Sequence, residues 1–417
     1  MQIILLDETR FDEFAFNHPN HSYFQTSNYG KFMSKQGYNA YYFGMVDDTN
    51  QIKAATLVLV KNDKENNKRK MGYAPRGFLI DWNDDNLVSE FTKLLKEFLA
   101  NRSFTFLKVD PAIIYKEHNL DGSEKTSELT HDGFVGKMQG MEYIHLGYNN
   151  GTEASKLRWN AYTTLNPNLV TLYNTISKDA RDKIKEASAL GGRVYKGSND
   201  DINMLYDLIS KPKPSLEYFL DYYHFFNANA TLEIYFTKLE PATYVNSSRN
   251  IYEKEQIKNN ELNAKMQDLS IANRDLLINE KMKSDELLAD YKNKMVDAIN
   301  MFQSYPNGIV VAGTALIKCG KKVYIVANGI KEEFKKNYPD YLLYWHLFQE
   351  LSKQGYEVVD FNGLTGNYLN DERTKYKVEL SNHIVEYVGE FDLVINKKGY
   401  YTGSKLNPII SWLNKPI

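Results

Sequence analysis

A long stretch from Asn246 to Tyr305 contains no glycine and no proline, the two residues that most strongly interrupt helices. Within it, two series of mostly apolar side chains step by three or four positions, first Leu262, Met266, Leu269, Asn273 and Leu276, then Leu288, Tyr291, Met295, Ala298 and Phe302. This is the spacing of a coiled-coil seam. Because the rhythm breaks between Ile278 and Asp285, we expect two antiparallel helices joined near residues 279–283, each of roughly 25 residues and about 37 Å.

The segments on both sides of this arm alternate between strand-like and helix-like patterns, which predicts a mixed α/β (α+β) fold. At 417 residues the chain is long enough for two or three domains. We predict a first domain over residues 1–150, completed by 396–417, and a second over 151–244 and 304–395. The arm, residues 245–303, is inserted in the second. Residues 375–377 and 384–395 are expected to be extended.

The charge and cysteine content exclude several classes of protein. With 51 Lys and Arg against 53 Asp and Glu, no overall field attracts a polyanion, so such a site must be a local patch. Cys319 is the only cysteine, which excludes an intrachain disulfide and a thiolate metal cluster and fits a reducing compartment. No leader pattern or membrane-length apolar run is found. We therefore expect a cytoplasmic protein, with peripheral contact at the inner membrane face left open.

Common motifs of enzyme chemistry are missing from the sequence. It has no phosphate-binding P-loop, no dinucleotide fingerprint, no serine-hydrolase elbow and no acetyl-CoA pyrophosphate loop. The closest histidine pair, His18 and His21, has no third ligand nearby, so no metal site and no cofactor are predicted.

Five local patterns in one order resemble the Fem family of peptidoglycan-bridge aminoacyltransferases. They are Gln25 to Lys31 followed by Lys35 to Tyr38, Tyr73 to Asp81 (YAPRGFLID), Leu107 to Pro111 (LKVDP), Asp360 to Asn367 (DFNGLTGN), and Lys375 to Lys377 followed by Ile384 to Phe391. The arm falls where FemA-type members carry a helical coiled-coil insertion.

The resemblance implies two domains of the N-acetyltransferase (GNAT) fold, the second carrying the arm. It also implies transfer of an amino acid from aminoacyl-tRNA to an amine of a muropeptide precursor, either UDP-linked or lipid-linked, at the cytoplasmic membrane face. A homodimer or a paired paralogue is a further partner that such proteins suggest. The alternatives are a CoA-dependent N-acyltransferase, and a scaffold without activity that binds other proteins through its arm.

The resemblance implies two catalytic residues. Lys377 matches the position of a cation at the developing oxyanion, whereas the residue pattern alone predicts a solvated strand lysine. Asp110, at a strand end before Pro111, would orient the amine or accept its proton, or else would cap the turn.

Substrate contacts follow from the same comparison. Lys31 matches a lysine that meets the precursor's phosphates, and Lys213, or Lys211 if the alignment shifts, matches a phosphate-binding arginine. Tyr218 would contact substrate nearby. Arg76 would hold a carboxylate or phosphate, or fix its own loop by an ion pair. Tyr376 would stack in the site, or serve as an ordinary strand aromatic.

Two features concern the donor and the activity. The densest basic cluster outside the arm is a candidate for tRNA phosphates, with a solvated helix face as the alternative. It consists of Lys178, Arg181, Lys183, Lys185, Arg193 and Lys196, and we predict tRNA contacts for Lys178, Arg181, Lys185 and Arg193. After Lys377 the family commonly has Gly and an aromatic, whereas this chain has Glu379 and Leu380. An inward-pointing Glu379 would repel an anionic substrate.

Overall fold

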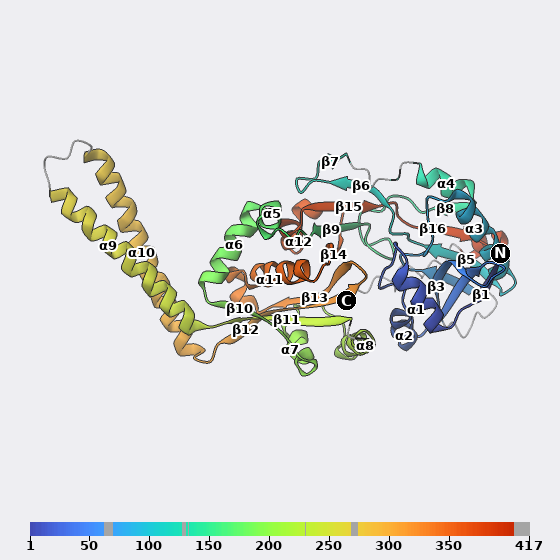
Figure 1. Cartoon of the computed structure of the whole chain (residues 1–417), viewed down its shortest axis with the longest axis horizontal. Helices are drawn as coiled ribbons and strands as arrows, with labels where there is room; N and C mark the ends of the chain where they lie inside the picture. Colours follow the sequence, from blue (N-terminus) through green and yellow to red (C-terminus); the bar gives the residue numbers. More distant parts are fainter. Residues whose placement is uncertain (62–69, 127–130, 132, 230, 268–273, 404–417) are drawn as a thin grey trace.

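A computed structural model of the chain describes residues 1–61, 70–126, 131, 133–229, 231–267 and 274–403. Two β-sheets with flanking helices form an elongated body, and a helical hairpin projects from one end of it (Figure 1). The predicted mixed α/β class is confirmed. Of residues 396–417, which are predicted to complete the first domain, those after 403 lie outside the described residues.

The first sheet has seven strands in the order β1-β2-β3-β4-β5-β16-β8, with β4 and β5 parallel and the other pairs antiparallel. Apolar faces of the helices cover both of its sides, α1 and α2 on one and α3 and α4 on the other. The strands are β1 (Gln2–Leu5), β2 (Tyr38–Val46), β3 (Ile52–Lys61), β4 (Lys70–Ala74), β5 (Phe104–Val109), β8 (Tyr143–His145) and β16 (Phe391–Val394). The helices are α1 (Glu8–Asn17), α2 (Ser27–Lys35), α3 (Asp85–Ala100) and α4 (Phe134–Gly140).

The second sheet has nine strands in the order β10-β11-β12-β13-β14-β9-β15-β6-β7, and only β13 and β14 are parallel among its described pairs. Its strands are β6 (Ile114–His118), β7 (Glu124–Lys125), β9 (Trp159–Thr164), β10 (Gly192–Lys196), β11 (Leu232–Leu239), β12 (Ile309–Cys319), β13 (Lys322–Ile330), β14 (Val358–Leu364) and β15 (His383–Tyr387). The remaining body helices are α5 (Leu169–Thr175), α6 (Lys178–Ala189), α7 (Ile202–Leu208), α8 (Leu216–Asn227), α11 (Pro339–Lys353), α12 (Lys375–Leu380) and α13 (Lys397–Gly403), with short 3-10 turns at Asn199–Asp201, Glu332–Asn337 and Tyr368–Asn370.

The two sheets exchange strands. The segment expected as one strand over 384–395 is two strands, β15 in the second sheet and β16 in the first. Between them Gly389 has φ +96°, a left-handed conformation that glycine adopts without steric cost. Conversely, β6 and β7 come from the N-terminal part of the chain but belong to the second sheet, where they form one edge. The predicted domain boundaries at 150 and 396 remain a prediction.

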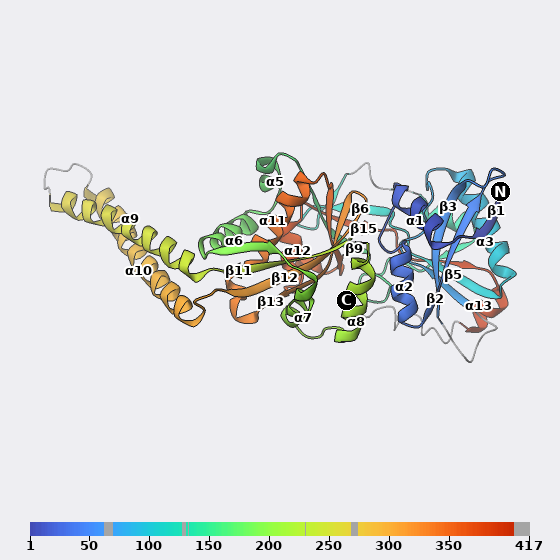
Figure 2. The same cartoon turned by 60° about the horizontal axis from the view of Figure 1, so that its bottom comes forward.

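The arm consists of α9 (Pro241–Gln267) and α10 (Arg274–Ser304), which pack against each other (Figure 2). The predicted joint at residues 279–283 is wrong, because these residues lie inside α10. The apolar rhythm breaks there for another reason. Asn259 donates to Ser284 Oγ at 3.0 Å, and Ser284 donates to Glu255 at 2.6 Å. Buried polar contacts thus replace apolar ones across the helix pair.

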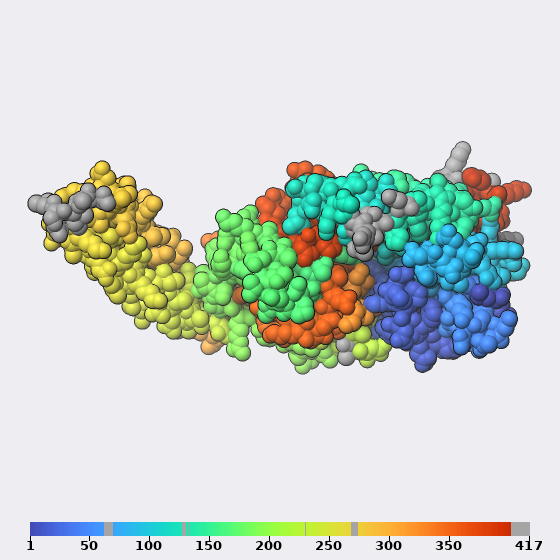
Figure 3. All heavy atoms as spheres, turned by 45° about the horizontal axis from the view of Figure 1, so that its top comes forward, coloured from blue at the N-terminus to red at the C-terminus, as the bar shows by residue number. Residues whose placement is uncertain are grey.

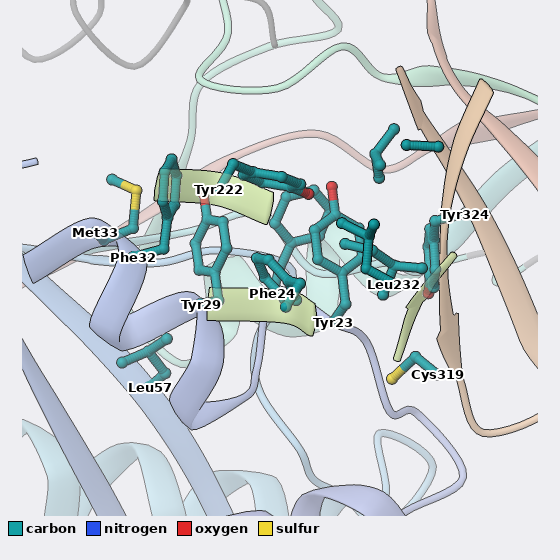
Figure 4. Close-up of a cluster of buried hydrophobic side chains, with 14 of the residues drawn as sticks. Tyr23, Phe24, Tyr29, Phe32, Met33, Leu57, Tyr222, Leu232, Cys319 and Tyr324 are labelled. Carbon is teal, nitrogen blue, oxygen red and sulfur yellow. The ribbon is translucent and has the colours of Figure 1, made fainter. Parts of the chain in front are cut away.

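One apolar core joins the two sheets. Side chains of α1, α2 and β3 pack in the same cluster as side chains of α7, α8, β11, β12 and β13. Figure 4 shows Tyr23 at its centre, between Phe24 and Tyr29 on one side and Tyr324 on the other. The ring of Tyr23 lies 4.8 Å from that of Tyr324 and 5.7 Å from that of Phe226. We call each sheet with its flanking helices a unit, the first unit being built on the seven-stranded sheet and the second on the nine-stranded one. A shared apolar core therefore holds the two units together.

Within the described residues, no helix combines the length and the apolar character that crossing a membrane requires.

A truncation in the shared core should destabilise the whole body. Phe226 is 1% exposed and contacts both Tyr23 and Tyr222, so we expect Phe226→Ala to lower the free energy of unfolding by about 3–5 kcal/mol. Urea denaturation followed by circular dichroism measures it. The control is Phe16→Ala, a phenylalanine 41% exposed on α1, which should change stability by less than about 1 kcal/mol. Equal effects of the two variants would contradict a shared core.

Candidate active site

A cavity of about 700 Å³ lies where two parallel strands diverge. β13 and β14 are paired only over Lys322–Tyr324 and Val358–Asp360, although both strands continue further. Each strand is irregular beyond that point: the register of β13 shifts at residues 325–327, and that of β14 shifts between Asp360 and Gly363. The strands separate, and residues 325–328 and 361–363 line the opening. Residues 19–24 and Arg76 of the first unit form the facing wall.

Lys377 lines this cavity from α12, so the predicted extended conformation of residues 375–377 is wrong. Its Nζ donates to the Gly363 carbonyl oxygen at 3.1 Å, which holds the amine against the separated end of β14. Burial lowers the pKa of Lys377 to about 8, partly opposed by Asp360 and Asp371. The cavity thus contains a cation that can lose its proton at mildly alkaline pH.

Tyr376 of α12 also lines the cavity and contacts both strands, Asn328 of β13 through its hydroxyl and Phe361 of β14 through its ring, with the two ring centroids 6.3 Å apart. Its hydroxyl donates to Asn328 Oδ1 at 3.0 Å, and its ring stacks on Tyr344 with centroids 5.9 Å apart. Asn362, whose side chain donates to the Ile325 carbonyl oxygen, forms a second bridge. These contacts hold the strands at a fixed separation.

Arg76 lines the cavity, whereas Asp110 lies behind it and is absent from the described lining. Asp110 accepts the Arg76 backbone N–H at 2.7 Å and pairs with its guanidinium at 3.6 Å. The guanidinium donates to the Leu157 carbonyl oxygen at 2.9 Å and lies 4.5 Å from the centroid of Tyr387. Burial raises the pKa of Asp110, opposed by Arg76. Asp110 therefore fixes the Arg76 loop from behind, while Arg76 itself lines the cavity, and the predicted substrate and catalytic roles of the two residues stay predictions.

Lys156 and Lys322 line the same cavity and were missed by the sequence reasoning. The Lys156 ammonium lies 3.9 Å from the centroid of Phe24, and burial lowers its pKa to about 8. Lys322 donates to the Tyr162 hydroxyl at 3.1 Å, and that hydroxyl is hydrogen-bonded to Tyr387. Neither lysine belongs to a sequence motif, because each reaches the cavity only through the packing of the two units.

Asp360 is 1% exposed, and it is the one deeply buried carboxylate among the described residues that line the cavity. It accepts hydrogen bonds from the Asn160 side chain at 2.9 Å and from the Asn362 backbone at 2.7 Å. Burial raises its pKa, with Lys322 the largest opposing influence. Asp360 therefore anchors the turn that opens β14.

Three predicted substrate residues lie away from the described lining. Lys31 is exposed and pairs with Glu8 at 2.7 Å. Lys213 donates to the Tyr206 carbonyl oxygen at 2.8 Å and covers the Tyr206 ring, which directs it onto α7. Tyr218 packs edge-on against Phe32, and burial raises its pKa to about 12. Lys211, the alternative to Lys213, is exposed.

The predicted basic cluster lies on and beside α6. Lys178 and Lys185 are exposed, and Lys185 pairs with Asp182 at 3.3 Å. Arg181 donates to Asn174 Oδ1 at 3.1 Å, and exposed Arg193 pairs with Glu240 at 3.4 Å. Acidic partners thus screen part of the cluster.

Glu379 points away from the cavity. Its carboxylate accepts hydrogen bonds from Lys183 on α6 and from the Tyr341 hydroxyl, the latter at 2.6 Å. Leu380, the second unusual residue, is fully buried. Both departures from the expected pattern therefore fix α12 to its neighbours. Among the described residues, no group of three or more His, Cys, Asp or Glu side chains is placed to hold a metal.

Comparisons with known proteins agree over nearly the whole chain. A model of the FemAB family matches residues 6–406. Lipid II:glycine glycyltransferase of Staphylococcus epidermidis (strain ATCC 35984) is 21% identical, over 98% of this chain and 96% of the relative. Aminoacyltransferase FemA of Staphylococcus aureus (strain bovine RF122) is 24% identical, over 97% and 98%. The crystal structure of FemX covers 96% of this chain and 99% of its own, with a TM-score of 0.73 at 17% identity, and shows the same fold.

Removing the buried charge of Lys156 should stabilise the protein. Because its folded pKa of about 8 is below the ordinary value, the unfolded chain binds this proton more tightly, and folding is penalised wherever the lysine is charged. We expect Lys156→Met to raise the free energy of unfolding at pH 7 by on the order of 1–3 kcal/mol. The gain should shrink as pH rises from about 8 to about 10.5.

Urea titrations at several pH values test this expectation, with Lys185→Met on exposed α6 as the control. A gain that is independent of pH would show that packing, and not charge burial, sets the effect.

Proposed function

Because this chain belongs to the FemAB family, we propose that it is a transferase that moves an amino acid from aminoacyl-tRNA to an amine of a peptidoglycan precursor. The amine is that of the stem peptide or of a growing cross-bridge. The observation that carries the proposal is the family match over residues 6–406, together with a cation-bearing cavity at the junction of the two units. The activities that the names of the two relatives state, glycyl transfer to lipid II and aminoacyl transfer, support it.

The reaction requires little chemistry from the protein. The neutral amine attacks the carbonyl carbon of an activated ester, a C–N bond forms and the C–O bond to the tRNA breaks. The proton that the amine gives up is balanced by the one that the leaving tRNA hydroxyl takes up. What remains is to position two substrates and to stabilise the oxyanion. We assign the oxyanion to Lys377, whose amine lies in the cavity and is fixed by Gly363.

The acceptor brings phosphates and carboxylates, and the cavity offers cations for them. Arg76, Lys156 and Lys322 line it together with the aromatic side chains of Tyr23, Tyr324 and Tyr387. Arginine suits a planar carboxylate, and the lysines act as point charges. Lys31, Lys213 and Tyr218 remain predicted contacts for more distant parts of the precursor. In this proposal Asp110 contributes by holding Arg76 in position, through its hydrogen bond with the Arg76 backbone and its ion pair with the guanidinium.

The proposed donor, an aminoacyl-tRNA, is larger than the cavity, so most of the tRNA must bind to the outer surface of the protein. We assign the tRNA to the α6 cluster of Lys178, Arg181, Lys185 and Arg193, because surface cations contact phosphates without reading sequence; Arg181 is half-buried and the other three are exposed. Such binding would weaken steeply with added salt. A lipid-linked acceptor would bring the protein to the cytoplasmic membrane face.

A transfer assay tests the proposal against its alternatives. The purified protein is supplied with radiolabelled aminoacyl-tRNAs or acetyl-CoA, and with a lipid-linked muropeptide that carries a stem lysine. Label transferred only from tRNA supports the proposal. Label from acetyl-CoA would contradict it in favour of a CoA-dependent enzyme, and transfer from neither donor would favour a scaffold.

Loss of the Lys377 charge should affect turnover more than binding. We expect Lys377→Ala to lower kcat at least ~10²-fold with little change in precursor affinity. Because the pKa of Lys377 is about 8, the ratio of wild-type to variant turnover should be constant below that pH and should fall above it. Taking the ratio cancels the titration of the acceptor amine.

Lys375→Ala, at an exposed position on the same helix, is the control and should retain activity. A Lys377→Ala defect confined to KM would refute the oxyanion role.

A further inference from the structure

A second hollow lies on the surface of the second unit, between α5, α6 and α11. Its volume is about 660 Å³, and seven of its nine described lining residues are apolar or aromatic. The floor consists of half-buried Leu169, Tyr173, Leu342 and Trp345, which pack on the core beneath the three helices. Figure 3 shows the green surface of α5 and α6 beside the orange surface of α11, on one side of the molecule. We call this hollow the α6 groove.

Two aromatic rings in the floor are placed to receive a flat ligand. Tyr173 and Trp345 lie edge to face, with their ring centroids 4.9 Å apart. The Tyr173 hydroxyl donates to the Arg181 carbonyl oxygen at 3.2 Å, which fixes that ring. In contrast, no described residue accepts a hydrogen bond from the indole N–H of Trp345. Trp345 thus offers a ligand both part of its ring and a donor.

A row of polar and cationic side chains leads along α6 into the groove. Lys178, Arg181, Lys185 and Ser188 step by three, four and three residues, so they share one face of the helix. Lys185 and Ser188 line the groove themselves. A chain of phosphates that follows this face therefore passes directly over the apolar floor.

The opposite end of the groove carries a further cation. Gly192 lies so close to Leu342 of the floor that a Cβ there would be 2.5 Å from a Leu342 methyl group, and Arg193 follows it. Arg193 pairs with Glu240 at 3.4 Å, and Lys185 pairs with Asp182 at 3.3 Å. These pairs are exposed and contribute little to stability, so phosphates can replace the carboxylates.

Cations beside a stacking surface are the features that bind single-stranded nucleic acid. Aromatic side chains accept unpaired bases, whereas the bases of a duplex are covered by their neighbours. Because its cations are partly paired, the α6 cluster binds phosphates only moderately. A stacked nucleobase adds a contribution that salt does not screen.

The groove lies one helix away from Lys377. Ile184 is part of its wall, and the preceding Lys183 reaches the Glu379 carboxylate on α12, two residues from Lys377. The aminoacyl group of a charged tRNA is attached to an unpaired 3′ end. A strand that delivers this group to Lys377 from α6 therefore crosses the groove, a requirement that an acidic peptide or a lipid surface does not have.

We propose that the α6 groove stacks an unpaired nucleobase of the donor's single-stranded 3′ end on Trp345, while Arg181 and Lys185 contact the neighbouring phosphates. The identity of this RNA as the donor rests on the proposed function. The groove explains how α6 can hold the end of the strand, and not only the phosphates of the stem.

Fluorescence of the purified full-length chain tests the stacking. A short single-stranded RNA that ends in CCA should quench tryptophan emission, and Trp345→Leu should abolish this quenching. The Kd, measured by anisotropy of the labelled RNA, should rise at least ~5-fold in Trp345→Leu and much less in Trp345→Phe, which keeps a ring. Equal binding by wild type and Trp345→Leu, or equal quenching by the same RNA in a duplex, would overturn the proposal.

Salt separates the stacking from the phosphate contacts. The slope of log Kd against log salt reports the number of phosphates that cations neutralise. Trp345→Leu should raise the Kd by the same factor at low and at high salt, whereas Lys185→Gln should reduce the slope. A loss in Trp345→Leu that disappears at high salt would show that the residue only supports the cations, which contradicts stacking.

A surface variant guards against a folding defect. Val170 is 71% exposed at the edge of the groove, and an acid in this first turn suits the start of α5. Val170→Asp should raise the Kd for the RNA at least ~2-fold by repelling phosphates. Val296→Asp, at a valine 46% exposed on the arm, is the matched control and should leave the Kd unchanged. Equal effects, or binding of anionic vesicles in place of RNA, would overturn the proposal.

The transfer assay distinguishes failure of this inference from failure of the proposed function. Quenching by the RNA without transfer from any aminoacyl-tRNA would leave the groove as an RNA site and contradict the function. Transfer from aminoacyl-tRNA with the same KM in wild type and Trp345→Leu would support the function and refute the groove.

Discussion

The apolar core shared by the two sheets is the interaction on which the rest of the structure depends. Tyr23 and Phe24 come from the first unit and pack beside Tyr222 and Tyr324 of the second. The same loop, residues 19–24, forms one wall of the cavity. The packing that stabilises the pair of units therefore also sets the width of the site. A site built this way cannot exist in either unit alone.

The cavity itself is a consequence of interrupted strand pairing. β13 and β14 start as parallel neighbours, and irregular backbone in both separates them after three residue pairs. Asp360 holds the turn of β14 through Asn160 and the Asn362 backbone. The gap is then bridged by side chains, where a ladder would otherwise continue. This gives a polar opening inside a sheet, with cations at its edge and buried aromatic rings behind them.

Sequence patterns predicted the elements that have strong local signals. The arm was found from its spacing and its lack of Gly and Pro, and Arg76 and Lys377 from local motifs that do line the cavity. The arm's joint was misplaced because buried Asn259 and Ser284 imitate a break in an apolar seam. Lys156 and Lys322 had no local signal, since their position depends on contacts between distant segments. The helical state of residues 375–377 also depends on its neighbours, because α12 is too short to be stable alone.

The unusual Glu379 connects the proposed donor surface to the proposed oxyanion residue. Lys183 belongs to α6, whose exposed side carries the basic cluster, and it reaches inward to the Glu379 carboxylate. Glu379 lies on α12, two residues after Lys377, and a helix this short moves as a unit. This partly buried ion pair therefore ties the position of Lys377 to that of α6. Glu379 was expected to repel an anionic substrate if it pointed inward. Its carboxylate is instead paired with Lys183 outside the cavity, and this pair helps to orient the helix that carries Lys377.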